Sequence, residues 1–194
     1  MRYLGFSLGI FAVPALLGCG DPDPVSTVTD PAGKLVVAGE KAGGYKGKTS
    51  LERAFVGTWQ LVSFEGRPEG GGALIYPLGP DAIGQLRYDD AGNMGVFLGQ
   101  RNRPQFVSGD RRAGTDAEVR AAYEGIVTYF GKYTIDQVNG TVTHHVVGAD
   151  YPNWEGGEQV RWYQLEPGRL SLLTPPMLVH GQMTVYALVF ERVN

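Results

Sequence analysis

The feature that most constrains the fold is a series of short, strand-like stretches in the second part of the chain. Nine such stretches alternate apolar with polar residues or are rich in β-branched and aromatic residues: 55–65, 73–78, 83–90, 93–99, 132–138, 141–148, 158–166, 169–175 and 182–193. Turn-forming residues separate them, since 29 of 194 residues are glycine, about twice the usual frequency, and 12 are proline. Short strands at hairpin spacing are typical of antiparallel barrels and sandwiches. We therefore predict an all-β fold, either an antiparallel barrel or a sandwich.

One stretch, residues 114–130, departs from this pattern. Thr115 is followed three residues later by Glu118, which is the spacing of a helix capping box. The apolar residues after it recur at helical spacing: Val119, Ala122, Tyr123, Ile126 and Phe130. We predict one amphipathic helix of about three turns, packed over an end or side of the barrel.

The start of the chain has the pattern of an export signal. Arg2 precedes an apolar run that ends at Leu17 and is shorter than the roughly 20 residues needed to span a bilayer. The run "LLGC", ending at Cys19, resembles the bacterial lipobox. This resemblance implies that residues 1–18 are a lipoprotein signal peptide and that the Cys19 thiol is lipidated. The alternative is an ordinary secretory signal with Cys19 as a free thiol.

A lipidated Cys19 would place the protein in the bacterial cell envelope. Several acyl chains such as palmitate, at about 0.8 kcal/mol per buried methylene, would hold the chain on a membrane with its domain outside the cytoplasm. As the chain has a single cysteine, no disulfide can form within it. The membrane, reached through this anchor, is therefore an expected partner.

Residues 19–50 are rich in Gly, Pro, Ser, Thr, Asp and Lys, and bury too little apolar surface to offset their ordering entropy. We predict the lipidated cysteine and a flexible tether here, with an accessory strand at 35–38. Residues 51–194 form the expected barrel domain, of ordinary single-domain length. The net charge of −3, or −4 once residues 1–18 with their single Arg2 are removed, and the lack of a basic cluster argue against nucleic acid as a partner.

The first and last long strands carry a paired signature. The first contains Gly57, Thr58 and Trp59, and the last contains "VFER", which ends at Arg192. The pair resembles the signature of lipocalins and their relatives. The resemblance implies that the guanidinium of Arg192 stacks on the indole of Trp59 at the closed end of the barrel.

A longer resemblance extends from residue 55 to residue 192. The segments that carry it are "GTWQLVSFE", "YPLGPDAIGQLRYDDAGNMGVFL", "RPQFVSGD", "AYEGIVTYFGKYTID", "GTVTHHVVGADYPNWEGGEQVRWYQLEPGRLSLLTPP" and "LVFER". They resemble the bacterial and fungal lipocalin-like domain family. The resemblance implies a lipocalin-like β-barrel with an interior cavity, but no shared activity, because one fold serves many functions. We expect no cofactor.

The run "THHV" contains the most reactive side chains. On a strand His144 and His145 face opposite sides, so they form no metal pair, and we expect no metal site. His180 is the only other histidine. One of the pair is expected to line the cavity, as a ligand contact or an acid or base, or else to be a structural histidine. We favour His145, because it shares a face with threonines and would line a partly polar cavity.

Two further candidates lie near these histidines. The loop 150–159 contains Tyr151, Asn153 and Trp154, which either gate a ligand or plug the core. Arg161 either points outward into solvent, which we favour, or points inward. If inward, it needs an anionic ligand or one of the carboxylates of Asp136, Glu124 and Glu191.

Two kinds of chemistry have little support in the sequence. Residues 108–115 place glycines and arginines at a helix start, which is a weak signal for anion binding. The chain has no Gly-x-Ser-x-Gly elbow, so nucleophilic hydrolysis is not indicated.

Three functions are compatible with these features. The first is a membrane-anchored lipoprotein whose barrel binds a small apolar or amphipathic molecule. The second is a cyclase or isomerase in which a cavity His or Tyr moves a proton, and the third is a ligand-free envelope scaffold with a filled barrel. The volume and polar content of the cavity distinguish them.

Overall fold

The computed structural model describes residues 27–29, 35–37, 48–179 and 181–193. In the N-terminal part, β1 (Thr27–Thr29) pairs with β2 (Leu35–Val37) in antiparallel fashion, so the accessory strand is present over 35–37. The predicted signal peptide (residues 1–18), Cys19, Ala38 and His180 lie outside the described residues. The rest of this section concerns residues 48–193.

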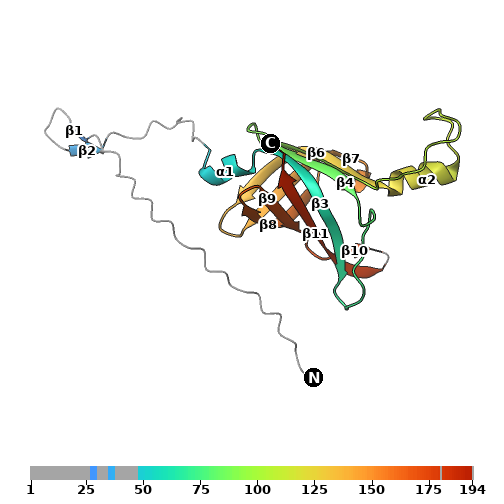
Figure 1. Cartoon of the computed structure of the whole chain (residues 1–194). Helices are drawn as coiled ribbons and strands as arrows, with labels where there is room; N and C mark the ends of the chain where they lie inside the picture. Colours follow the sequence, from blue (N-terminus) through green and yellow to red (C-terminus); the bar gives the residue numbers. More distant parts are fainter. Residues whose placement is uncertain (1–26, 30–34, 38–47, 180, 194) are drawn as a thin grey trace, which may run out of the picture. The chain divides into compact units, whose positions relative to one another are not determined.

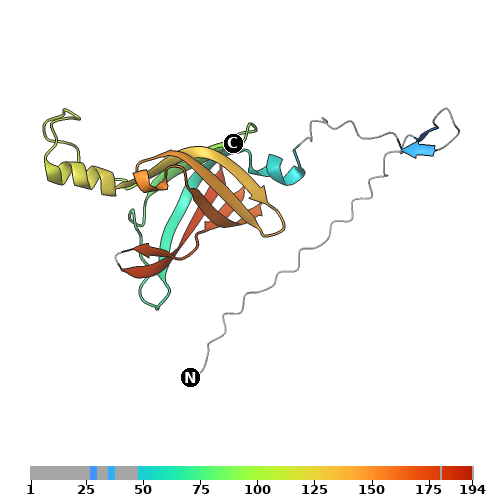
Figure 2. The same ribbon diagram turned by 180° about the vertical axis from the view of Figure 1, so that it is seen from behind.

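Eight strands of the second part form a closed antiparallel barrel (Figures 1 and 2). They are β3 (Gly57–Pro68), β4 (Ile83–Tyr88), β5 (Asn93–Gly99), β6 (Ile126–Asp136), β7 (Thr141–Ala149), β8 (Glu158–Glu166), β9 (Arg169–Leu173) and β11 (Gln182–Arg192). Neighbours in sequence pair in turn, and β11 pairs with both β9 and β3, which closes the barrel. A short strand, β10 (Met177–Val179), adds to β11. The predicted all-β barrel is confirmed.

Most predicted strands are present, with three differences. The stretch 73–78 forms no strand and makes only an isolated bridge between Ile75 and Gly66. Strand β6 begins at Ile126, before the predicted 132, and β10 was not predicted. A short helix, α1 (Ser50–Phe55), precedes the barrel and begins with a capping box at Thr49.

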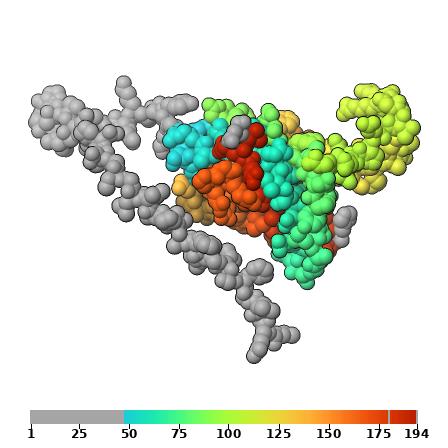
Figure 3. All heavy atoms as spheres, in the orientation of Figure 1, coloured from blue at the N-terminus to red at the C-terminus, as the bar shows by residue number. Residues whose placement is uncertain are grey.

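The predicted helix is present but shorter than expected and placed differently. Helix α2 (Asp116–Glu124) has the expected capping box and ends at Gly125, so Ile126 and Phe130 lie in β6. It buries none of its residues, and Val119 and Tyr123 are 51% and 46% exposed. The helix and the loop before it extend away from the barrel (Figures 1–3). The prediction that it packs over the barrel is wrong.

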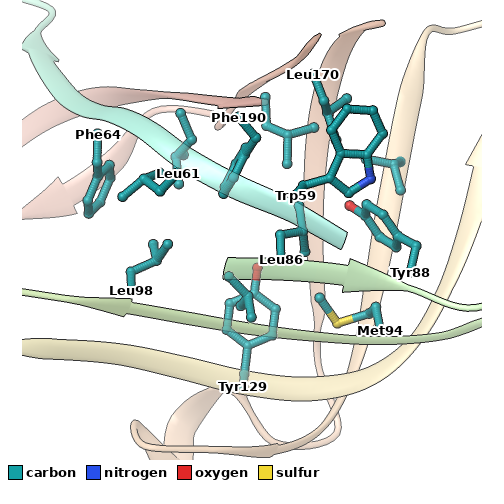
Figure 4. Packing of buried hydrophobic residues seen from close by; sticks show 14 of the residues in the cluster. Trp59, Leu61, Phe64, Leu86, Tyr88, Met94, Leu98, Tyr129, Leu170 and Phe190 are labelled. Atoms are coloured by element: carbon teal, nitrogen blue, oxygen red, sulfur yellow. The ribbon is translucent and has the colours of Figure 1, made fainter. Parts of the chain in front are cut away.

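Aromatic and aliphatic side chains from opposite walls fill one end of the barrel (Figure 4). Phe55 of α1 is fully buried and packs edge-on against Tyr163 and Tyr88, with ring centroids 4.9 and 5.6 Å away. The indole Nε1 of the fully buried Trp59 donates to the carbonyl of Phe55 at 2.9 Å. Helix α1 therefore anchors this end of the barrel.

The signature pair meets at the same end. The guanidinium of Arg192 lies 4.2 Å from the centroid of the Trp59 ring, which confirms the predicted stacking. It also donates to the carbonyls of Val56, at 2.7 Å, and Ala54. Gly57 has a φ of 143° and a Cβ there would collide with the Arg192 guanidinium, which explains the glycine of the signature.

Among the residues that the structure describes, no helix is long and apolar enough to cross a membrane.

Candidate functional site

An internal cavity of about 260 Å³ occupies the other part of the barrel. Most of its lining is apolar and comes from facing strands, for example Phe64, Val96 and Leu172. Leu78 and the strand β10 residues Met177 and Val179 also line it. Two exposed residues, Glu124 at the end of α2 and Pro77 before β4, also contribute to its lining.

The polar part of the lining gathers around His144. On β7 the side chains of Val142, His144 and Val146 are buried, whereas Thr141 and Thr143 on the other face are partly exposed. His144 is 1% exposed, and its Nε2 and Nδ1 lie 2.6 and 2.9 Å from the hydroxyls of Tyr88 and Tyr129. Both ring nitrogens are therefore hydrogen-bonded inside the protein.

The preference for His145 as the inward histidine is wrong. Its side chain is 38% exposed on the outer face, where Nε2 contacts the Thr134 hydroxyl at 2.9 Å and Nδ1 contacts the Glu158 carboxylate at 3.1 Å. The physical reason is that the interior of the barrel is predominantly apolar. The face of β7 that carries Val142 and Val146 therefore points inward. His144 lies on the same face and is buried with them.

His144 is neutral at physiological pH. Burial, together with the nearby charges of Arg161 and His145, lowers the pKa of His144 to about 3. Burial likewise raises the pKa of Tyr129, and raises that of Tyr88 well above its usual range. The cluster is thus an uncharged chain of Tyr88, His144 and Tyr129, which could relay a proton without holding a charge.

The available hydrogen-bond partners favour one arrangement of protons on Tyr88, His144 and Tyr129. Tyr88 is 2% exposed, and its hydroxyl has His144 as its hydrogen-bond partner among the described residues. If Tyr88 accepted a hydrogen bond from His144, its own O–H would be buried without an acceptor, which is costly. Tyr88 therefore donates to Nε2 and the Nδ1–H donates to Tyr129. The O–H of Tyr129, which lines the cavity, is left to donate elsewhere.

Arg161 points inward, so the favoured outward orientation is wrong. It is 7% exposed and lines the cavity, because β8 turns the same face inward as at Tyr163. The Nη1 donates to the carbonyl of Val160 at 2.7 Å and the Nη2 to the Gln159 side chain at 3.1 Å. Arg161 also lies beside Tyr129, where its charge and a hydrogen bond oppose the effect of burial on the pKa of that hydroxyl.

None of the three carboxylates considered as partners pairs with Arg161. Glu124 pairs with Arg120 at 3.2 Å and Glu191 with Arg169 at 3.5 Å. Asp136 accepts hydrogen bonds from the Asn139 side chain and nearby backbone N–H groups. The described residues thus supply no carboxylate for this buried cation.

The loop between β7 and β8 contributes one aromatic side chain to the cavity. It forms a single 3₁₀ turn, η1 (Pro152–Trp154), which places Trp154 in the lining and edge-on to Tyr129, with ring centroids 5.8 Å apart. Tyr151 is 41% exposed and packs against the outer side of Trp154, outside the lining. The geometry is compatible with both the gate and the plug interpretations of this loop.

The segment 108–115 does not present an open helix N-terminus to an anion. The carboxylate of Glu118 accepts hydrogen bonds from the backbone N–H groups of Thr115 and Val107 at 2.7 and 2.8 Å. The helix thus caps itself with its own carboxylate. Within the described ranges, no group of three His, Cys, Asp or Glu side chains has a geometry that could hold a metal ion.

Sequence reasoning missed both tyrosines of the polar cluster. Tyr129 fell inside the stretch assigned to the helix, although "IVTYFGKYTI" is β-branched and aromatic enough to indicate a strand. Tyr88 lay in a predicted strand, but nothing in the sequence marks it as a neighbour of His144, 56 residues away.

Comparisons with known proteins agree with this architecture. A family model described as a lipocalin-like domain matches residues 56–193. A relative from Aspergillus oryzae, named 4'-hydroxy-3'-methoxypropiophenone carrier protein ppsC, is 31% identical over 85 residues, which are 40% of this chain and 77% of the relative.

Proposed function

The chain belongs to the lipocalin-like domain family, and on this premise we propose that it binds and carries a small apolar or amphipathic molecule inside its barrel. The observation that carries the proposal is the cavity of about 260 Å³, lined mainly by apolar side chains around one buried polar cluster. This volume lies just below the range of about 300–1,000 Å³ that is usual for ligand pockets. A small ligand therefore fits the proposal best.

The name of the fungal relative supports this assignment. It describes a carrier of an aromatic ketone that also bears a hydroxyl and a methoxy group, which is an amphipathic molecule. An apolar cavity with a few placed donors suits molecules of that kind, because the apolar wall contributes affinity and the polar groups fix the orientation.

A specific observation favours a second candidate, an isomerase or cyclase. Tyr129 lines the cavity and is hydrogen-bonded to His144, so a proton could move between a bound molecule and the buried chain through the Tyr129 hydroxyl. The low pKa of His144 weighs against this candidate, because a base whose pKa is about 3 takes up a proton poorly at neutral pH. The third function, a scaffold with a filled barrel, is disfavoured by the cavity itself.

We propose further that the mature protein is a lipoprotein held on a membrane of the bacterial cell envelope through Cys19. The support is the "LLGC" run after the apolar segment. In this arrangement the barrel would carry its ligand close to the membrane surface.

Ligand binding is tested by titrating the protein with 4'-hydroxy-3'-methoxypropiophenone and following tryptophan fluorescence, since Trp154 lines the cavity. A Val127→Trp variant fills the cavity from its lining. A matched Val147→Trp variant adds the same side chain to the outer face of β7, where Val147 is 62% exposed. Saturable binding by the wild type and by Val147→Trp, weakened at least about tenfold in Val127→Trp, supports the proposal. Binding that is equal in both variants contradicts it.

A further inference from the structure

We infer that the cavity selects a ligand with a carboxylate group, held by the guanidinium of Arg161 and the hydroxyl of Tyr129. This inference rests on the proposed function, because it names the ligand class for the same cavity.

The burial of the charged side chain of Arg161 is the first observation that supports a carboxylate ligand. Among the described residues that are buried, Arg161 is the only one with a permanent charge. A buried guanidinium is costly unless an anion pairs with it. Its hydrogen-bond acceptors on β8, the Val160 carbonyl and the Gln159 side chain, are both neutral.

The N–H donors of Arg161 that have no acceptor on β8 favour an anion with two oxygens. A guanidinium has five N–H donors in a planar fork, and a carboxylate accepts two of them side by side. The two neutral acceptors on β8 and the oxygen of Tyr129 together cannot occupy all five donors. Because Arg161 lines the cavity, its remaining donors are accessible to a molecule bound there.

Tyr129 supplies a second donor at the same place. The Tyr129 oxygen accepts from His144 and from Arg161, so its O–H is free to donate into the cavity. A carboxylate is an acceptor only, which matches an arrangement made only of donors. An alcohol also accepts from Tyr129, but it brings no charge to Arg161.

The rest of the cavity suits the apolar remainder of such a molecule. Apolar side chains, including Leu78 before β4 and Met177 and Val179 of β10, complete the lining. Glu124, the single acidic residue among those that line the cavity, is exposed and already paired with Arg120. A small carboxylic acid would therefore bind with its head at Arg161 and its tail along the apolar wall.

The test compares octanoate with 1-octanol, which share a chain length and differ in the charged head. Both are titrated calorimetrically into protein carrying Cys19→Ala, so that no detergent competes, after bound molecules have been removed on an apolar resin. We expect octanoate to bind at least about tenfold more tightly than 1-octanol. In Arg161→Met this preference should disappear, while the affinity for 1-octanol stays within about twofold.

Arg87→Met is the matched control, because Arg87 is exposed on β4 and its removal changes the net charge equally. Its preference for octanoate should equal that of the parent protein. Arg161→Met should keep or raise the unfolding temperature, because it removes a buried charge that has no anionic partner in the protein. A large drop in that temperature would contradict the inference, since it would mean that the protein itself compensates the charge.

The outcomes distinguish a wrong carboxylate assignment from a cavity that binds no ligand. Equal affinity for octanoate and 1-octanol, or a preference that survives in Arg161→Met, overturns the carboxylate assignment and leaves cavity binding intact. If neither compound binds, the inference is wrong, and the ketone titration decides separately whether the cavity binds another class of molecule.

Discussion

At the scale of single residues, the account depends on a few buried polar side chains in an apolar barrel. His144 is kept neutral by burial and by the charge of Arg161, and it orders the hydroxyls of Tyr88 and Tyr129 through both of its ring nitrogens. Its role in the proposed binding is therefore to position Tyr129, which meets the cavity.

The low pKa of His144 predicts an acid-sensitive contribution to stability. The folded-state pKa of about 3 lies below the ordinary 6.5, so between these values the unfolded chain binds a proton that the folded chain does not. The stabilisation is complete above about pH 6.5 and falls by about 1.4 kcal/mol per pH unit as the pH drops toward 3. The groups that face the ring are Tyr88, Tyr129 and Arg161.

The measurement is the free energy of unfolding, by denaturant, between pH 7 and about pH 4. His144→Gln should show a shallower loss of stability than the wild type across this range. His145→Gln, which changes the neighbouring histidine on the outer face, should keep most of the slope that His144 contributes, because burial is the largest cause of the low pKa of His144 and the charge of His145 a smaller one. Identical slopes for the wild type and His144→Gln would show that burial does not set the protonation of this ring.

Sequence reasoning identified the signature residues and the two histidines, but it did not predict which side chains point into the barrel. The signature residues Gly57, Trp59 and Arg192 could be recognised because their contact is local to the barrel closure and depends on residue type. Strand alternation separated His144 from His145 but did not say which face was inside. Arg161 was misplaced because its surroundings, Tyr129 above all, come from a strand that had been assigned to the helix.

At the scale of elements, β-strand pairing determines which side chains can meet. Strands β6 and β7 shift register between Phe130 and Gly131, so that Val147 is an extra residue on β7. The shift brings Gly131 opposite Val146, close to the backbone of His145. Only a residue without a Cβ fits there. This irregularity thus lies beside the strands that present Tyr129 and His144.

This close approach predicts that Gly131→Ala destabilises the barrel. The added methyl would collide with the backbone carbonyl of His145, which cannot move without disturbing the pairing, at an expected cost of about 1–3 kcal/mol. Gly95→Ala is the control, because a Cβ at this other strand glycine meets nothing closer than 3.8 Å. It should be neutral or stabilising by about 0.5–1 kcal/mol. Equal effects of the two substitutions in thermal unfolding would refute the steric argument.

Helix α2 shows that sequence patterns within one segment predict where a helix begins but not where it ends. The capping box at Thr115 and Glu118 correctly predicted the start of the helix, because capping is decided within one turn. The apolar spacing then suggested a longer helix, although Gly125 ends it and the following residues pair with β5. That pairing depends on a partner strand, which periodicity within one segment does not reveal.

At the scale of the whole molecule, the fold could be predicted and the position of the ligand site only in part. The series of short stretches with glycine-rich turns predicted an antiparallel barrel or sandwich, and the resemblance to the lipocalin-like family decided for the barrel. The cavity depends on how side chains from all of the strands fill the interior. Its polar cluster joins β4, β6, β7 and β8, which no local pattern connects.

The proposed anchor makes a prediction about the entire protein. If Cys19 is acylated, the wild type fractionates with membranes and mass spectrometry finds a lipid-modified mature chain that begins at Cys19. Cys19→Ala should move the protein to the soluble fraction. An unmodified thiol together with a different N-terminus would eliminate the anchor, without affecting the account of the cavity.

Native mass spectrometry of protein purified from its own host determines whether the barrel encloses a small ligand. The account predicts that the wild type carries a small molecule in one-to-one ratio, and that Val147→Trp retains it. Val127→Trp, which fills the cavity, should lose the molecule while remaining folded by circular dichroism. A wild-type protein without any bound small molecule, or a molecule retained equally by Val127→Trp, would contradict the claim.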